Sequence, residues 1–72
     1  MTNDSEYVVR FNEQEFTIRI THAKEKQQYR AYLFDAVNNE LGSGRWNTSE
    51  EADRALKEIA QRVATVQSKV HR

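Results

Sequence analysis

Apolar and polar residues alternate with a period of two over residues 16–20, and residues 7–11 form a second, mostly apolar run near the N-terminus. Such alternation is typical of strands that bury one face, and both segments are rich in β-branched and aromatic residues. The polar residues 12–15 between them predict a hairpin with a four-residue loop. The residues expected to face inward are Val9, Phe11, Phe16, Ile18 and Ile20.

A second pair of strands is predicted over residues 29–37 and 40–46, after a polar connection over 22–28. Asparagine tolerates positive φ better than most residues, so Asn38-Asn39 is predicted to form a two-residue turn between them. That turn pairs Val37 with Glu40, Phe34 with Ser43, Leu33 with Gly44 and Ala31 with Trp46.

This register sorts the side chains of the second hairpin onto two faces. The first set is assigned to the helix side, because its small residues at 31, 42 and 44 allow a helix to approach closely. It comprises Tyr29, Ala31, Leu33, Gly42, Gly44 and Trp46. The second set comprises Arg30, Tyr32, Phe34, Leu41, Ser43 and Arg45. The opposite assignment stays open, since Tyr32, Phe34 and Leu41 are bulky enough to form a core.

The last third of the chain changes to a helical period. Thr48-Ser49-Glu50-Glu51 matches a capping box, and the acidic residues after Thr48 suit the positive end of a helix dipole. An apolar stripe then recurs at spacings of three and four: Ala52, Leu56, Ile59, Val63, Val66 and Val70. The pattern predicts one long helix that begins near Thr48 and continues almost to the C-terminus.

Together these elements predict an α+β fold, an antiparallel meander of three to four strands followed by one long C-terminal helix packed on one sheet face. Residues 1–6 are expected to form a disordered N-terminal tail, and residues 7–72 a single domain.

The 72 residues include 11 basic and 11 acidic side chains and no cysteine or proline. Without cysteine, neither a disulfide framework nor a thiolate metal site can form. The polar, acidic start lacks a signal-peptide pattern, and no apolar run is long enough to cross a bilayer. These features predict a cytoplasmic protein with no membrane partner. Zero net charge argues against a uniformly basic, nonspecific nucleic-acid coat.

Strand alternation nevertheless gathers four arginines on the uncovered sheet face, one from each strand and with no acidic residue among them. They are Arg10, Arg19, Arg30 and Arg45. Arginine binds phosphate and guanine edges through paired donors, and the exposed rings of Tyr32 and Phe34 offer stacking platforms. This face predicts DNA or RNA binding. Alternatively, the arginines simply lie on the wet face, with their stems covering Tyr32 and Phe34.

A family resemblance supports the predicted fold. Over residues 29–60, a strand ends in Gly44-Arg45-Trp46 and a helix opens with Thr48-Ser49-Glu50-Glu51-Ala52. This segment resembles the three-stranded-sheet-plus-helix DNA-binding domain of plant ethylene-response factors and phage integrases. In that family the sheet lies in the major groove. The resemblance implicates Arg45 and Trp46 in DNA contact and, more loosely, Arg30 and Tyr32.

The predicted helix of about 33 Å is longer than a seven-residue strand of about 23 Å. Its end is therefore expected to project beyond the sheet, leaving Val63, Val66 and Val70 as an apolar interface. Through this stripe or through an exposed sheet edge, the chain would bind a second copy of itself or another protein, as a homodimer, an accessory subunit or a small inhibitor. Alternatively, the end of the helix frays, or N-terminal residues pack beneath it.

No residue pattern points to catalysis, a metal or a cofactor. His22 and His71 are the only histidines, and neither has a second ligand at a spacing typical of zinc sites. Ser43 lies between two glycines, but in a predicted strand and not in the strand-to-helix turn that a nucleophile elbow requires. Asp35 and Glu40 flank a turn and are expected to face solvent. The sequence therefore predicts a non-enzymatic binding module.

Overall fold

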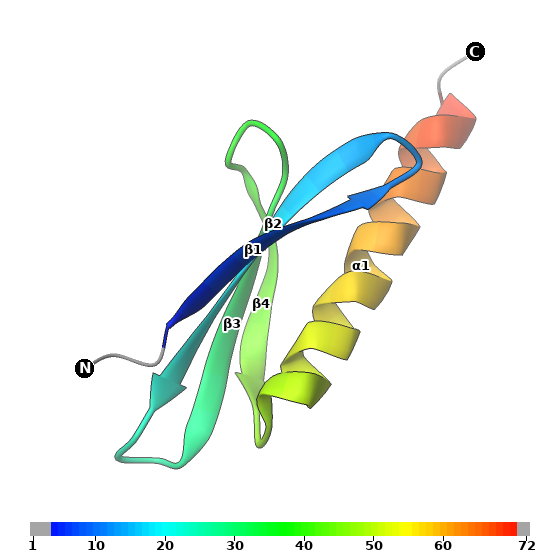
Figure 1. The fold of residues 1–72 in the computed structure, drawn as a ribbon. Coiled ribbons are helices and arrows are strands. Elements are labelled where there is room, and N and C mark those ends of the chain that lie inside the picture. The colour runs from blue at the N-terminus through cyan, green and yellow to red at the C-terminus, as the bar shows by residue number, and fades with distance from the viewer. Residues whose placement is uncertain (1–3, 71–72) are drawn as a thin grey trace.

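The computed structural model describes residues 4–70, with side chains described for 4–66. Four strands form one antiparallel sheet in meander order, and one helix lies across one face of it (Figure 1). The elements are β1 (Ser5–Phe11), β2 (Gln14–Ala23), β3 (Gln28–Phe34), β4 (Glu40–Trp46) and α1 (Ser49–Val70). The predicted α+β fold, a meander followed by a C-terminal helix, is confirmed.

Two strands extend further than the sequence predicted. β1 begins at Ser5, which pairs with Ile20, so Ser5 and Glu6 belong to the sheet and not to a tail. β2 continues through His22 to Ala23, into the segment predicted as a connection. These polar residues are strand residues because a neighbouring strand supplies their backbone partners, as Gln28 does for Ala23. Residues 1–3 of the predicted tail lie outside the described residues.

The β1–β2 turn is shorter than predicted. Asn12 and Glu13 form a two-residue turn with φ angles of 51° and 65°, while Gln14 and Glu15 already pair with Phe11 and Arg10. Two successive residues with positive φ are the mark of a type I′ turn, whose twist matches that of the flanking strands. The expected four-residue loop over 12–15 is therefore wrong.

The β3–β4 connection also differs from its prediction. β3 ends at Phe34, and the Asp35 amide donates to the Asn39 carbonyl at 3.0 Å. The Asn38 amide donates to the Asp35 carbonyl at 3.0 Å, and Asn38 has a φ of 65°. This is a three-residue loop that ends in a left-handed residue, not a two-residue turn at Asn38-Asn39.

The Asp35 side chain holds this loop together. Its Oδ1 accepts hydrogen bonds from the amides of Asn39 at 2.8 Å and Val37 at 3.0 Å. These bonds, led by that of Asn39, hold the pKa of the Asp35 carboxyl below its ordinary value. Asp35 thus favours the longer loop over the tight turn.

The longer loop shifts the β3–β4 register by two residues from the prediction. Ala31 pairs with Gly44 and Leu33 with Gly42. A shift of two leaves every side chain on its face, so the predicted helix-side set holds. Leu41 is the exception, because a bulge at this point pairs Phe34 with Glu40. Leu41 packs against the core and not on the outward face.

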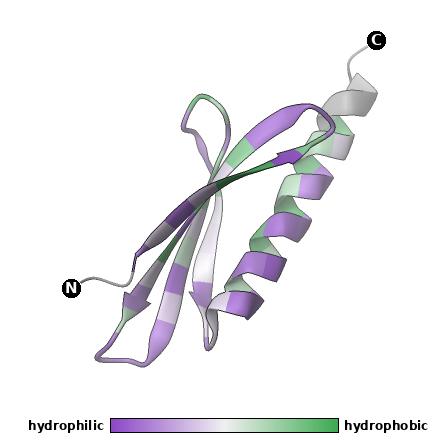
Figure 2. Cartoon of the chain, viewed as in Figure 1, coloured by the Kyte–Doolittle hydropathy of each residue, from purple (hydrophilic) through white to green (hydrophobic). Residues whose placement is uncertain are grey.

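The core lies between the inner sheet face and α1, where Figure 2 shows the apolar stripe of the helix turned toward the sheet. Its members are at most 5% exposed: Phe16, Ile18, Ile20, Ala31, Leu33, Ala52, Leu56, Ala60 and Ala64. Ala60 and Ala64 were not in the predicted stripe, whereas Ile59 and Val63 are half-buried at its margin. Small residues line the closest part of the helix-to-sheet contact.

Gly42 and Gly44 accommodate two large side chains. A Cβ at Gly42 would lie 3.2 Å from Cδ1 of Ile59, so this glycine lets α1 approach β4. A Cβ at Gly44 would lie 2.7 Å from the Trp46 ring, which folds over the strand. The close approach was predicted, but for the Ala52 and Ala55 region of the helix.

The helix begins as predicted. The Glu51 amide donates to Thr48 Oγ1 at 3.1 Å, and the Thr48 hydroxyl donates to the Glu51 carboxylate at 3.1 Å. The Ala52 amide donates to the Thr48 carbonyl at 3.2 Å, which starts the helical ladder.

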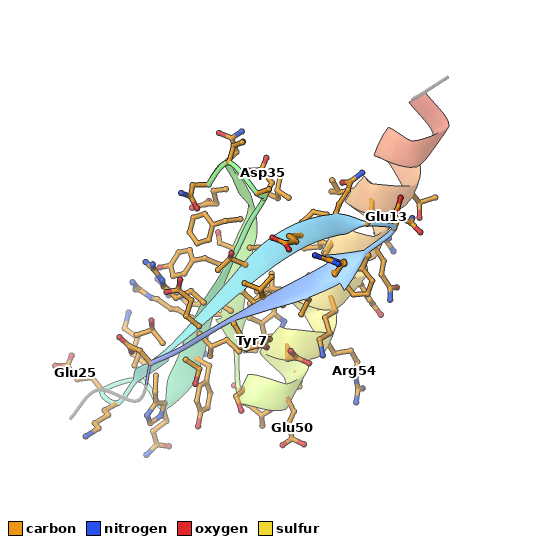
Figure 3. All side chains as sticks on the ribbon, turned by 45° about the horizontal axis from the view of Figure 1, so that its top comes forward. Tyr7, Glu13, Glu25, Asp35, Glu50 and Arg54 are labelled. Atoms are coloured by element: carbon orange, nitrogen blue, oxygen red, sulfur yellow. The ribbon has the colours of Figure 1, made fainter. Side chains whose placement is uncertain are left out.

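The C-terminal half of α1 remains packed against the sheet at least as far as Ala64. The β1–β2 hairpin turns toward it (Figures 1 and 3), and Val9, Phe11 and Phe16 contribute to the core that buries Ala64 completely. The helix does not overhang as it would over a flat sheet, because sheet twist rotates β1 and β2 beneath the second half of the helix.

Candidate nucleic-acid interface

All four predicted arginines lie on the sheet face opposite α1, and all four are exposed. Arg10 comes from β1, Arg19 from β2, Arg30 from β3 and Arg45 from β4. Tyr32 and Phe34 share this outward face and are half-buried. Strand alternation therefore brings the predicted side chains to one surface.

The expectation that this face has no acidic residue is wrong. Glu6 and Glu15 lie on it as well, because β1 starts at Ser5 and the first turn has only two residues. Arg19 pairs with Glu6 at 3.1 Å and Arg10 with Glu15 at 2.7 Å. All four side chains in these pairs are more than half exposed, so each pair contributes at most about 1 kcal/mol. Recognising Asn12 as a turn residue would have revealed both glutamates.

Arg19 also covers the aromatic pair. Its guanidinium carbon lies 5.8 Å from the centre of the Phe34 ring, and the Phe34 and Tyr32 rings are stacked with centres 6.4 Å apart. Arg19 therefore fits the alternative interpretation, in which an arginine side chain covers the aromatic residues of the exposed face.

Arg30 and Arg45 differ from the other two arginines. They are direct cross-strand partners on β3 and β4, and neither forms an ion pair within the described part of the chain. Like charges directly opposite each other destabilise a sheet. Together with Tyr32, Ser43 and Gly44 they line a shallow depression on the outward face. We name these five residues the arginine site.

Charge on the outward face varies along the strands. The arginine site lies toward the β2–β3 turn, which carries Lys24 and Lys26 on either side of Glu25. The opposite end, where Figure 3 labels Glu13 and Asp35, also holds Glu15 and Glu40. Asp4 and Glu6, however, share a hollow with Tyr32 beside the arginine site, and Arg10 lies among the acidic residues of the opposite end, so the charge is only partly separated along the sheet.

Trp46 lies on the other side of the sheet. It is half-buried against the core and folds over Gly44, on the face that packs against α1. The family resemblance assigned it a DNA contact together with Arg45, but successive residues of a strand point to opposite faces. Trp46 is therefore not part of the arginine site.

A groove of about 810 Å³ lies between β1 and the first half of α1. Across it the Tyr7 hydroxyl donates to Asp53, whose carboxylate also pairs with Lys57 at 3.0 Å. Partial burial and the bond to Asp53 raise the pKa of Tyr7. Partial burial works to raise the pKa of Asp53, but the bonds from Tyr7 and Lys57 outweigh it and lower that pKa. Both shifts move away from neutrality, so neither group gains the properties of a general acid or base at pH 7.

Among the described residues, no three histidine, cysteine or acidic side chains form a cluster suited to a metal. The His22 ring stacks on Tyr29 with centres 4.6 Å apart, and its Nδ1 is buried without a partner in the described structure. His71 lies outside the described residues. Within residues 4–70, no helix is long and apolar enough to cross a membrane.

The apolar stripe predicted as an interface does not form one surface. Val63 packs against the core, whereas Val66 is 59% exposed. The side chain of Val70 lies outside the described residues.

The resemblance to DNA-binding domains concerns a sheet of three strands, whereas this sheet has four. Comparisons with protein-family models, curated proteins and solved structures found no match to this chain.

Proposed function

We propose that the protein binds nucleic acid through its outward sheet face, with the arginine site as the principal contact. The observation that carries this proposal is the cross-strand pair of Arg30 and Arg45, exposed and without an ion-pair partner among the described residues. Two guanidinium groups side by side are suited to bind successive phosphates or one phosphate and a guanine edge.

The cost of this arrangement supports a functional role. An acidic residue at either position would give a favourable cross-strand pair, as Glu15 does opposite Arg10. A bound phosphate would supply the missing negative charge. Tyr32, next to Arg30 on the same face, would then stack on a base. Lys24 and Lys26 in the adjacent turn would extend the positive surface along the backbone.

Fluorescence anisotropy with labelled duplex and single-stranded oligonucleotides at low salt tests this function. We expect binding that weakens steeply with salt and falls on substitution of Arg30→Ala and Arg45→Ala. Each variant should reduce the slope of log K against log salt by about 0.9 for a duplex. If the wild-type protein binds neither the duplex nor the single-stranded probe at low salt, the proposal is contradicted.

Arg10→Ala is the matched control, since Arg10 is an exposed arginine of the same face that is paired with Glu15. It removes the same net charge but leaves the arginine site intact. We expect it to change affinity less than either Arg30→Ala or Arg45→Ala. Equal losses in all three variants would show a diffuse charge effect and no defined site.

Arg45→Glu separates binding from folding. The substitution places opposite charges across β3 and β4, so the free energy of unfolding should increase by about 0.2–1 kcal/mol. Nucleic-acid affinity should decrease in the same variant. Urea unfolding and the anisotropy titration measure the two effects independently.

A further inference from the structure

β1 is an edge strand whose outer side is unpaired within residues 4–70. The sheet order places β2 on one side of β1 and no described strand on the other. α1 packs chiefly on β3 and β4, and Glu6, Val8 and Arg10 of β1 are exposed. An open strand edge is a template for pairing with another strand.

The register identifies which backbone groups are free at this edge. In a hairpin closed by a two-residue turn, the pair next to the turn, Phe11 and Gln14, is hydrogen-bonded, and such pairs then alternate with unbonded ones. Phe11, Val9, Tyr7 and Ser5 therefore direct their backbone groups to β2. The backbone groups of Glu6, Val8 and Arg10 point away from β2, toward the open edge of the sheet.

The side chains of these three residues lie on the outward face. Val8 is the middle residue of β1 and is 61% exposed. Glu6 and Arg10 lie two residues before and two residues after it, with opposite charges. The pattern is complementary to itself when the strand direction is reversed.

We propose that two copies of the chain pair through β1, antiparallel, with Val8 on the two-fold axis. Val8 then faces Val8 of the second copy, and Glu6 faces Arg10 of the second copy at both ends. The free backbone groups of all three residues are paired, and the two sheets become one continuous sheet of eight strands.

The charges on the outward face favour this register. Glu6 is already paired with Arg19, and Arg10 with Glu15, within each copy. Dimerisation joins these two pairs across the interface into a row of alternating sign. Moving the axis to Val9 would set Val8 opposite Arg10, and moving it to Tyr7 would set Val8 opposite Glu6. Both shifts lose the contact between the two valines.

Sedimentation velocity at rising protein concentration tests the proposal. The mass should increase from the 8.5 kDa of one chain toward twice that value. Val8→Lys places two ammonium groups beside the axis and should raise the dimer dissociation constant by about tenfold or more. Val66→Lys is the matched control, because Val66 is 59% exposed on α1 and receives the same change. It should leave the dimer intact.

A charge-swap experiment tests the register. E6R alone and R10E alone each bring like charges together at both ends of the interface, so each should dimerise more weakly than the wild type. When the two variants are mixed, both ends of the heterodimer again join opposite charges, and association should be restored. One ion pair within each copy, Glu6–Arg19 in E6R and Arg10–Glu15 in R10E, remains broken in the mixture, so the restoration would come from the interface alone.

Three results would overturn the proposal: a monomer up to millimolar concentration, a dimer lost in Val66→Lys but kept in Val8→Lys, or no gain of association on mixing. Circular dichroism of each variant verifies the fold. The test uses no nucleic acid, so its outcome is independent of the arginine site.

Discussion

Tyr7 and Asp53 form a contact that links the edge strand to the helix across the groove. The pKa of Tyr7 is raised above its ordinary 10.0, chiefly by partial burial and then by the Asp53 carboxylate. The folded state therefore holds the Tyr7 proton more tightly than the unfolded chain does. The corresponding stability is present below pH 10 and is lost as pH rises toward the folded pKa.

Tyr7→Phe tests this contact. We expect the free energy of unfolding at neutral pH to fall by about 1 kcal/mol, because the substitution removes a hydrogen bond to a charged group. The decline of stability above pH 10 should also become shallower. Urea unfolding at a series of pH values, followed by circular dichroism, measures both effects. Tyr32→Phe, on the outward face, should keep the alkaline decline, and a steep decline in Tyr7→Phe would refute the assignment.

At acid pH, stability changes in the opposite direction and falls as the pH is lowered. Asp53 and Asp35 have pKa values below the ordinary 3.8, so their stabilising effect is present above that pH and is lost as pH falls through the folded values. The two groups act in different places. Asp53 links α1 to β1, whereas Asp35 closes the β3–β4 loop.

At the scale of elements, the helix-to-sheet distance depends on small residues at the closest approach. Gly42 on β4 faces Ile59 on α1, and Ala31, Ala60 and Ala64 are fully buried nearby in the same core. Close packing of this kind tolerates neither a cavity nor an added methyl group without adjustment. The distance between α1 and the sheet is therefore set by residues with small side chains.

Gly42→Val should lower the free energy of unfolding by about 1–3 kcal/mol, because the added methyl groups meet Ile59 and displace the helix. In an Ile59→Ala background the same substitution should cost less, which a double-mutant cycle by urea unfolding would measure. Ser43→Val is the control: the next residue of β4 is exposed on the outward face, and valine suits a strand. A similar loss in both variants would show that strand propensity, and not helix contact, is responsible.

The ends of the strands at the two hairpin turns could not be predicted from the sequence. Asn12-Glu13 and the loop 36–38 both contain residues with positive φ, yet neither contains glycine. Asparagine marks both sites, but it does not specify how many residues the turn spans. Tertiary twist selects the tight turn at residue 12, and the Asp35 side chain selects the longer loop after β3.

At the scale of the whole molecule, one hydrophobic cluster joins β2, β3 and α1, with β1 and β4 packed at its margins. A single core in a chain of this length predicts one cooperative unfolding transition. Tryptophan fluorescence reports from Trp46 beside the helix start, and circular dichroism reports on the whole sheet and helix. The two probes should therefore give the same midpoint.

Leu56→Ala should lower the free energy of unfolding by about 2–5 kcal/mol, because Leu56 is fully buried on the helix face. Both probes should shift together in urea. Val66→Ala, at an exposed position of the same helix, should change stability little. Separate transitions for fluorescence and circular dichroism would contradict the single core.

The arrangement of charge is likewise a property of the whole molecule. Equal numbers of basic and acidic residues say nothing about any one face. The strands place Glu6 and Glu15 beside Arg19 and Arg10 and leave Arg30 opposite Arg45. The functional proposal rests on this last pair, which only the observed register brings together.

The sequence by itself determined the fold class, the inward residues of β1 and β2, the start of α1 and the two faces of β3 and β4. These features follow from periodicity and capping, which are local, and a register shift of two residues does not change the faces. Tertiary structure decided the turn lengths, the register, the side of Leu41 and the pairing of the arginines. It also decided how much of α1 is covered, because these features depend on strand twist and on contacts between residues far apart in the chain.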